Sequence, residues 1–154
     1  MTEEDRIERL VCEYGRMLVR LAASRLDSVA DAEDAVQDVF CTLVSKKLVF
    51  VDPEYEKAWL IRATINRASD LRRRKSRLNV PLDEARAVPD DAAETERRGR
   101  EMLACVRALP EKYAVVLHLH YYEGCGLREI GVMLRVPAAT VGTRLARGRA
   151  RLKA

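Results

Sequence analysis

The carboxyl-terminal stretch of the chain carries arginines on the side of a predicted helix that we expect to be exposed. They lie at positions 144, 147, 149 and 151, just after Thr143. A planar guanidinium group can hold a phosphate or read the edge of a guanine, so this helix could contact nucleic acid. A short apolar stripe over 127–134 and a break at Arg135–Ala138 precede it. This is the layout of a helix-turn-helix, and the alternative is a solvated basic face on an ordinary terminal helix.

Four aspartates follow one another at spacings of four, three and four residues along a second predicted helix. They are Asp27, Asp31, Asp34 and Asp38. No lysine or arginine lies between Leu26 and Ser45, so we expect these carboxylates to lack local partners and to repel one another by about a few tenths of a kcal/mol per pair. Such a stripe suits a basic protein surface. A metal site without histidine and simple solubility are the alternatives.

A third stretch, residues 59–77, is strongly basic and contains Asp70 as its single acid. Its basic residues are Arg62, Arg67, Arg72, Arg73, Arg74, Lys75 and Arg77. Charges of one sign cannot be packed together without an anion, so we expect this run to bind phosphate. Asn66 could hydrogen-bond a base, and Trp59 could stack on an unpaired one, as in single-strand binding sites. Burial of Trp59 in the core is the competing interpretation.

Residues with catalytic or metal-binding chemistry are few. His118, His120 and Cys125 are one ligand short of a zinc site, and two histidines at spacing two point about 200° apart on a helix. The sequence has no glycine-rich phosphate loop, no GxSxG motif and no paired His and Cys for nucleophilic catalysis. We therefore expect no enzymatic activity, no catalytic residue, no metal and no cofactor.

The elements that must position these residues are predicted to be helices. Apolar residues recur at spacings of three and four from Ile7 to Leu26, from 28–31 to about Lys47, and from Glu56 into the basic run. Another helix begins at Pro110 and leads into the helix-turn-helix. Prolines and acidic residues interrupt the pattern between these parts. We predict an all-α protein of two small helical domains, 1–78 and 101–154, joined by a flexible acidic linker over 79–100.

Composition agrees with this division. The chain has 154 residues, of which 48% are hydrophobic and 5% aromatic, a mixture that favours helices and excludes an all-β barrel. The net charge is +1 over 1–78, −3 over 79–101 and +6 over 102–154, which indicates a polyanionic partner for the last part. No apolar stretch reaches the roughly 20 residues of a membrane helix, so we expect a cytoplasmic protein without membrane insertion. The four scattered cysteines are expected to be reduced and mostly buried.

Three stretches, taken in order, resemble an extracytoplasmic-function (ECF) sigma factor of the sigma-70 family. DAEDAVQDVF at 31–40 resembles region 2.2, and AWLIRATINRASDLRRRKSR at 58–77 resembles regions 2.3 and 2.4. LPEKYAVVLHLHYYEGCGLREIGVML, followed by VPAATVGTRLARGRARL, resembles region 4. The match covers nearly the whole chain. It implies a protein that binds core RNA polymerase and starts transcription at promoters carrying −10 and −35 elements.

The resemblance also implies roles for individual residues. The contact with the β′ clamp helices of core polymerase would fall to Asp34, Gln37 and Asp38. The −10 element would be read, as an opened strand with a flipped base, by Trp59, Arg62, Asn66, Arg73 and Arg74, with the loop 50–56 contributing to the pocket. The −35 duplex would be bound by Thr143, Ala146 and Arg147, with Arg128, Arg144 and Arg149 on phosphates.

Further partners follow from the same resemblance. Region 4 would contact the β flap of polymerase, and the acidic linker would thread polymerase channels where its carboxylates mimic phosphates. An anti-sigma factor is a further possible partner, because a flexible linker leaves room for a protein wedged between the domains.

Two glycines depart from the family pattern in the predicted recognition helix. Gly142 stands where lysine or arginine is usual, and Gly148 stands where a helix former such as alanine is usual. Each costs roughly 1 kcal/mol of helix stability relative to alanine, so our hypothesis is a softer recognition helix that orders on binding. Two other functions remain open, namely a stand-alone helix-turn-helix regulator that binds palindromic duplexes and an adaptor that uses only the acidic stripe.

Overall fold

The computed structural model describes residues 2–78, 101 and 104–153, and all regular elements in these ranges are helical. The N-terminal half forms α1 (Glu3–Ala23), α2 (Val29–Ser45) and α3 (Pro53–Arg77). The C-terminal half forms α5 (Glu111–Leu117), the π-helical turn η1 (His118–Tyr122), α6 (Leu127–Leu134) and α7 (Ala138–Lys153), and residues 104–108 are also helical. The all-α prediction is confirmed. The predicted linker, 79–100, lies outside the described residues.

Local capping explains where the first three helices begin. Thr2 and Asp5 form a capping box at α1, and Ser28 caps α2 by accepting a hydrogen bond of 3.2 Å from the Asp31 backbone. The third helix begins at Pro53, three residues earlier than we predicted. Its start is fixed because Asp52 accepts a hydrogen bond of 2.9 Å from Glu54 N, and because proline suits the first helical position.

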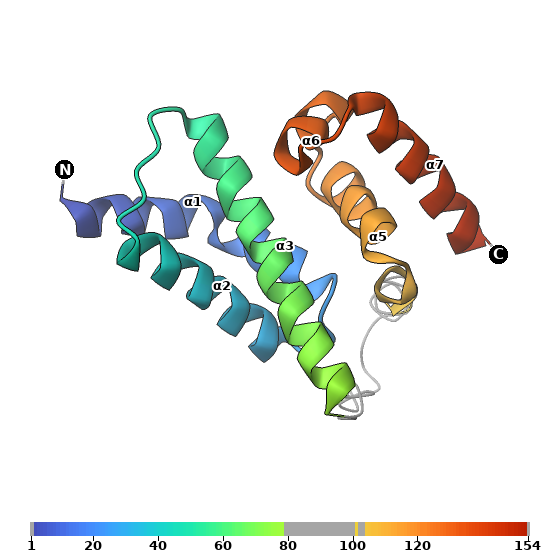
Figure 1. Cartoon of the computed structure of the whole chain (residues 1–154), viewed down its shortest axis with the longest axis horizontal. Coiled ribbons are helices and arrows are strands. Elements are labelled where there is room, and N and C mark those ends of the chain that lie inside the picture. The colour runs from blue at the N-terminus through green and yellow to red at the C-terminus, as the bar shows by residue number, and fades with distance from the viewer. Residues whose placement is uncertain (1, 79–100, 102–103, 154) are drawn as a thin grey trace, which may run out of the picture.

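The three N-terminal helices form one bundle, in which α3 crosses α1 and α2 (Figure 1). Its core contains fully buried leucines from every helix: Leu10, Leu18 and Leu21 of α1, Leu43 of α2 and Leu60 of α3. Burying each such side chain contributes roughly 1.5–3 kcal/mol. The bundle is therefore a firm support for the outward faces of α2 and α3, which carry the acidic and basic residues singled out above.

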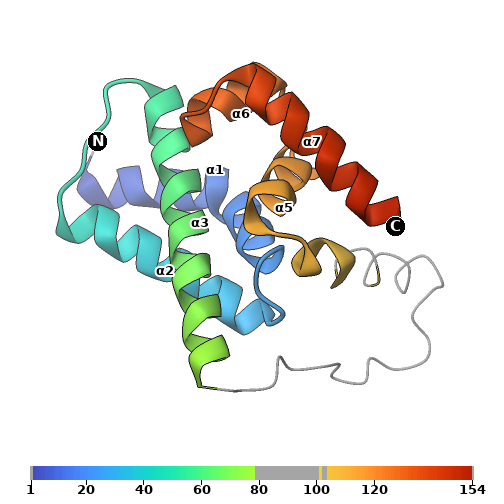
Figure 2. The same ribbon diagram turned by 45° about the vertical axis from the view of Figure 1, so that its right-hand side comes forward.

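Helix α5 lies between α7 and the N-terminal bundle (Figure 2). Residues 113–119 are all buried, so this stretch is covered on every side. A helix that is apolar all round needs neighbours on more than one face. The two halves of the chain consequently pack against each other, with α6 beside α3.

The helix-turn-helix has the predicted layout. Helix α6 ends at Leu134, and Arg135 turns the chain with a left-handed backbone conformation, φ 60° and ψ 42°. Gly131 is required here, because a Cβ atom on it would lie 2.7 Å from the Val136 carbonyl oxygen. The break predicted at 135–138 is confirmed, and the second helix begins at Ala138.

Two further expectations are tested by the described residues. No helix among them is long and apolar enough to cross a membrane. All four cysteines are unpaired, but Cys12, Cys41 and Cys105 are exposed and only Cys125 is buried, so the prediction of mostly buried thiols is wrong.

Candidate nucleic-acid interface

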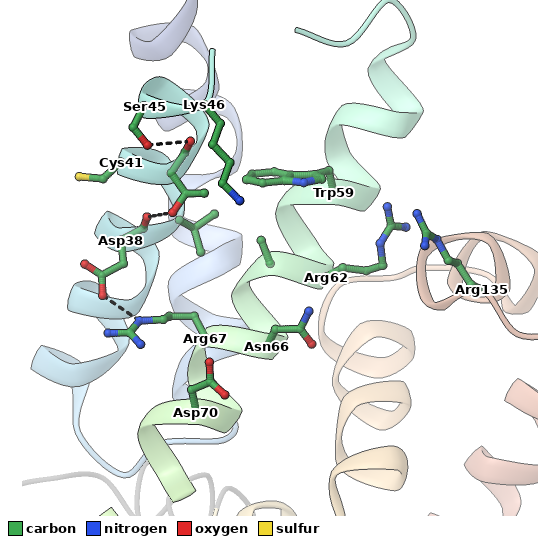
Figure 3. Close-up of a pocket in the computed structure, with 13 residues that line it drawn as sticks. Asp38, Cys41, Ser45, Lys46, Trp59, Arg62, Asn66, Arg67, Asp70 and Arg135 are labelled. Atoms are coloured by element: carbon green, nitrogen blue, oxygen red, sulfur yellow. Dashed lines mark hydrogen bonds and ion pairs between the residues drawn. The ribbon is translucent and has the colours of Figure 1, made fainter. Parts of the chain in front are cut away.

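A hollow of about 980 Å³ lies between α2 and α3 and reaches the turn that precedes α7 (Figure 3). Trp59, Arg62 and Asn66 of α3 line it together with Asp38 of α2 and Arg135 of the turn. The three α3 residues are spaced by three and four positions, so they share one face of the helix. The structure thus brings together three of the five residues predicted to read an opened strand.

The position of Trp59 is compatible with both interpretations considered for it, core packing and stacking on a base. Its ring packs on Phe50, with centroids 5.9 Å apart, and it is partly buried against the core. It also lines the hollow, where a planar base could stack on it. The loop 50–56 was expected to contribute to this pocket directly. Of that loop, Phe50 instead supports the tryptophan without lining the hollow.

Arg62 is held by the C-terminal half of the chain. Its Nη1 donates a hydrogen bond of 2.9 Å to the Met133 carbonyl oxygen at the end of α6. Figure 3 shows its guanidinium opposite that of Arg135. Burial, and secondarily the positive charge of Arg135, lowers the pKa of Arg62. Two cations facing each other beside an open hollow favour an anion between them.

The acidic stripe of α2 is largely paired, which corrects our prediction of unpartnered carboxylates. Asp38 accepts a hydrogen bond of 2.8 Å from Arg67, and Lys75 pairs with Asp31 and lies 3.7 Å from Asp27. The hydrogen bond with Asp31 is the main cause of the raised pKa of Lys75. The partners escaped prediction because they come from α3, which is remote in the sequence.

Asp34 and Gln37 lie on the exposed side of α2, and Asp34 makes no ion pair within the described residues. Of the carboxylate stripe, this is the charge that remains available to a partner. Exposed ion pairs such as that of Asp38 with Arg67 are weak. A basic group of a partner protein could therefore replace Arg67 as the partner of Asp38.

The basic run of α3 is also partly committed to the protein itself. Arg72 donates to the carbonyl oxygens of Arg25 and Arg107 at 3.1 and 2.7 Å, and Arg73 pairs with Asp70. The expectation that the whole run must bind phosphate is therefore wrong, because carboxylates and backbone carbonyls supply part of the compensation.

Arg73 and Arg74 are exposed at the far end of α3. They follow Trp59 by 14 and 15 residues, which places them about 21 Å further along the helix. The structure does not bring them together with the hollow. They could contact only a more distant part of the same nucleic acid.

The outer face of α7 carries the residues predicted to bind duplex DNA. Thr143, Ala146, Arg147 and Arg149 are exposed, Arg144 is half-buried, and Arg128 is exposed on α6. The opposite face is buried through Val141, Leu145 and Gly148. The helix is therefore supported by its core face and presents the predicted residues outward.

Two of these side chains already have partners in the structure. The Thr143 hydroxyl donates to the Ala139 carbonyl oxygen at 3.1 Å, and Arg149 donates to the hydroxyl of Tyr121 at 2.5 Å. Both could contact DNA while keeping these bonds, because a hydroxyl that donates retains its acceptor lone pairs and a guanidinium retains its other N–H groups. Arg147 is exposed and makes no ion pair within the described residues.

A smaller hollow of about 370 Å³ adjoins the beginning of α7. It is lined by Lys112, Tyr113, Ala139, Thr140, Thr143, Arg144 and Arg147. The sequence interpretation missed Lys112 and Thr140. Lys112 belongs to α5, and no local spacing connects it to α7, whereas Thr140 lies three residues before Thr143 and could have been included.

The two glycines of α7 have different surroundings. A Cβ atom at Gly148 would lie 3.0 Å from Leu117 and 3.3 Å from Tyr113, so this glycine allows α5 and α7 to pack closely. Among the described residues, a Cβ atom at Gly142 would meet Leu127 alone, at 3.4 Å. Gly148 therefore has a packing role that the sequence interpretation lacked, and the soft-helix hypothesis now rests on Gly142.

His118 and His120 both have other partners in the structure. The described residues contain no group of three side chains able to hold a metal ion. His120 Nδ1 lies 2.9 Å from the Cys125 carbonyl oxygen, and His118 is buried and stacked on Tyr122 with ring centroids 5.3 Å apart. Burial raises the pKa of the Cys125 thiol.

Family models match both halves of the chain. "Sigma-70 region 2" matches residues 10–78, and "Sigma-70, region 4" matches residues 99–152. The two models follow one another in the order expected from the sequence.

Curated relatives match along nearly the whole chain. The ECF RNA polymerase sigma factor SigM of Mycobacterium tuberculosis is 32% identical over 94% of this chain and 74% of its own length. SigW of Bacillus subtilis is 28% identical over 98% of this chain and 89% of its own length. SigE of Mycolicibacterium smegmatis is 30% identical over 95% of this chain, which spans 60% of that relative.

A solved structure has a similar fold. The sigma factor RpoE of Bartonella quintana, crystallised with the anti-sigma factor NepR, superposes with a TM-score of 0.68 at 19% identity. The superposition covers 95% of this chain and 93% of that one.

Proposed function

Because the chain belongs to the sigma-70 family, as an ECF sigma factor, we propose that it binds core RNA polymerase and directs it to promoters with −10 and −35 elements. Sigma factors of this family are not enzymes by themselves. The observation that carries the proposal is the shared wall formed by Trp59, Arg62 and Asn66, because a surface for stacking on and hydrogen-bonding an opened strand has no use in a duplex-binding repressor.

The −10 element is assigned to the N-terminal domain, residues 1–78. Asn66 would hydrogen-bond a flipped base in the hollow of Figure 3, and Trp59 would stack on it. Arg62 would hold a neighbouring phosphate. Arg73 and Arg74 would contact the backbone further along the strand, which fits their exposure and their distance from the hollow.

Docking on core polymerase is assigned to the exposed side of α2. Asp34 and Gln37 would face the β′ clamp helices, and Asp38 would join them by exchanging its bond with Arg67. The Asp34 carboxylate is exposed and has no ion pair among the described residues. This supports the assignment, since a charge without an internal partner loses least when it binds a basic surface.

The −35 element is assigned to the C-terminal domain, residues 101–154. Thr143, Ala146 and Arg147 would enter the major groove of the duplex, and Arg128, Arg144 and Arg149 would hold phosphates. This domain would also contact the β flap. The linker over 79–100 would connect the two domains when both are bound to the polymerase. Because bacterial RNA polymerase works in the cytoplasm, we propose that the protein acts there too.

A protein antagonist is a further proposed partner. The similar RpoE was solved in complex with the anti-sigma factor NepR. We extend that class of partner to this chain because the two folds superpose over 95% of this chain with a TM-score of 0.68.

The first test is capture of bacterial core RNA polymerase by tagged protein. Wild-type protein is expected to capture the enzyme, and the double variant Asp34→Arg, Asp38→Arg is expected to lose it. The matched control is Glu4→Arg, Glu8→Arg, which makes the same charge change at exposed positions of α1. If neither wild type nor control captures polymerase while the protein alone binds duplex DNA tightly, the stand-alone regulator is the correct interpretation.

A further inference from the structure

The charges around the hollow of Figure 3 are compensated at one end and not at the other. Both carboxylates that line the hollow, Asp38 and Asp70, are paired with arginines of α3. These pairs lie away from Trp59 (Figure 3). Lys46, the residue at which α2 ends, extends into the hollow beside Trp59 (Figure 3). Positive charge without a neighbouring carboxylate therefore gathers at the tryptophan.

Lys46 is the cation that the α2 wall of the hollow presents. It is exposed and makes no ion pair or side-chain hydrogen bond within the described residues. The hydroxyls of Thr42 and Ser45 line the same wall, but they donate to carbonyl oxygens of α2 at 3.0 and 3.3 Å. A hydroxyl has a single proton to donate, so these two groups are already committed and an anion would turn to Lys46.

The backbone at Lys46 is fixed by the way in which α2 ends. Lys47 adopts a left-handed conformation with φ 51°, and the amides of Lys47 and Leu48 each donate a hydrogen bond of 3.1 Å to a carbonyl oxygen in the last turn of α2. This is a Schellman motif. Arg6 of α1 also donates to the Leu48 carbonyl oxygen at 2.8 Å. The turn is therefore held on both sides, and it places Lys46 at the hollow while Lys47 does not line it.

Arg62 is the counterpart of Lys46 on the α3 wall. It lies one helical turn after Trp59, and it bonds to a carbonyl oxygen rather than to a carboxylate, so its charge is also uncompensated. A nucleotide whose base stacks on Trp59 has a phosphate on its 5′ side and another on its 3′ side. The two walls supply one cation for each of these phosphates.

We propose that Lys46 is a phosphate contact for the opened strand and holds the phosphate on one side of the stacked base, while Arg62 holds the phosphate on the other side. Together they fix the backbone of the nucleotide that Asn66 reads. The proposal rests on the proposed function of the hollow in binding the −10 strand. The sequence interpretation missed Lys46, because it belongs to α2 and meets the reading residues of α3 only in the folded chain.

The variant that tests this is Lys46→Gln in the full chain, which removes the charge and keeps a polar side chain. Lys47→Gln is the matched control, because it removes the same charge from the adjacent exposed residue, which does not line the hollow. Lys46→Arg keeps the charge and is expected to behave as wild type. Each protein is assembled with bacterial core RNA polymerase before binding is measured.

The first measurement is the salt dependence of DNA binding by these holoenzymes. The probe is a labelled promoter duplex, selected in vitro by the wild-type holoenzyme and prepared with an unpaired −10 region, and binding is followed by fluorescence anisotropy. Lys46→Gln is expected to bind about three- to tenfold more weakly. The slope of log affinity against log salt is expected to become shallower by about 0.7, the value for one phosphate of a single strand. Lys47→Gln is expected to change neither quantity.

The second measurement locates the contact on the strand. The two phosphates that flank the base read by Asn66 are replaced, one at a time, by a neutral methylphosphonate. Each replacement is expected to weaken binding of the wild-type holoenzyme. With Lys46→Gln, one of the two replacements is expected to have no further effect, because the charge pair is already lost, and with Arg62→Gln the same is expected for the other replacement.

Three results would overturn the proposal. Equal salt slopes for Lys46→Gln and Lys47→Gln would show that Lys46 holds no phosphate. Full additivity of Lys46→Gln with both replacements would place the lysine away from these two phosphates. Reduced capture of core polymerase by Lys46→Gln would assign the residue to the docking face of α2. In all three cases the wild-type holoenzyme still binds its promoter and the proposed function stands, whereas a wild-type protein that captures no polymerase or selects no promoter would overturn the proposed function and this proposal with it.

Discussion

Arg67 of α3 and Asp38 of α2 form an ion pair of 2.8 Å between the helix assigned to DNA and the helix assigned to polymerase. Both side chains also line the hollow of Figure 3. The two proposed interfaces are therefore adjacent and share a charge pair. Because the two side chains are 28% and 50% exposed, the pair contributes at most about 1 kcal/mol to folding and can be exchanged for external partners.

The first prediction separates polymerase docking from folding on α2. Asp34→Arg is expected to reduce capture of core polymerase at least tenfold and to change the free energy of unfolding by less than about 0.5 kcal/mol, because Asp34 is exposed and unpaired within the described residues. Arg67→Ala is expected to leave capture intact while costing up to about 1 kcal/mol. Capture by pull-down and urea unfolding on the same preparations measure the two effects. Undiminished capture by Asp34→Arg would remove that residue from the interface.

The second prediction concerns base recognition in the hollow. Asn66→Ala is expected to keep polymerase capture and stability but to lose preference at one position of the non-template strand, because the amide would no longer hydrogen-bond a flipped base. In vitro selection of promoter sequences with the reconstituted holoenzyme measures this. Arg74→Ala, at the far end of α3, serves as a comparison and is expected to weaken binding at all sequences about equally. An unchanged consensus with Asn66→Ala would assign base recognition elsewhere.

Local patterns in the sequence were sufficient to predict the helices, the turn at Arg135 and the exposed side of α7. These features depend on apolar spacing and on capping residues a few positions away. The partners of Asp31, Asp38 and Arg72 could not be predicted in this way, because they depend on how α3 crosses the other helices.

The glycines illustrate the same limit. From the sequence, Gly142 and Gly148 were both expected to lower the stability of the helix by the same amount. The position of α5 distinguishes them, because it lies against Gly148 and not against Gly142. Lys112 was missed for the same reason, since α5 and α7 are brought together by tertiary packing.

The third prediction compares these two glycines. Gly148→Ala is expected to destabilise the protein by about 1–3 kcal/mol, because a Cβ atom there would press on Leu117 and Tyr113 and the close approach of α5 and α7 would have to relax. Gly142→Ala is expected to stabilise it by up to about 1 kcal/mol, because the site is open enough and alanine favours the helix. Thermal unfolding of both variants measures the difference. Equal effects of the two substitutions would contradict the packing role assigned to Gly148.

The last prediction concerns His118, whose ring is buried against Tyr122. Burial is the main cause of a pKa lowered from 6.5 to about 4; the nearby Glu123 opposes this shift, and Arg20 adds to it. In the unfolded chain the imidazole regains its ordinary pKa and takes up a proton below about pH 6.5, which the folded chain does not do until about pH 4. The contribution of His118 to stability is therefore fully present above pH 6.5 and is lost as the pH falls toward 4.

At pH 5 the expected loss is about 2 kcal/mol relative to pH 7.5. Urea unfolding at the two pH values measures it, and His118→Phe, which keeps a flat apolar ring without the titrating nitrogen, is expected to remove most of the difference. His120→Gln is the matched control and is expected to retain it, because His120 is only partly buried and hydrogen-bonded to Cys125. If His118→Phe shows the same loss at pH 5 as wild type, another group is responsible for the acid sensitivity.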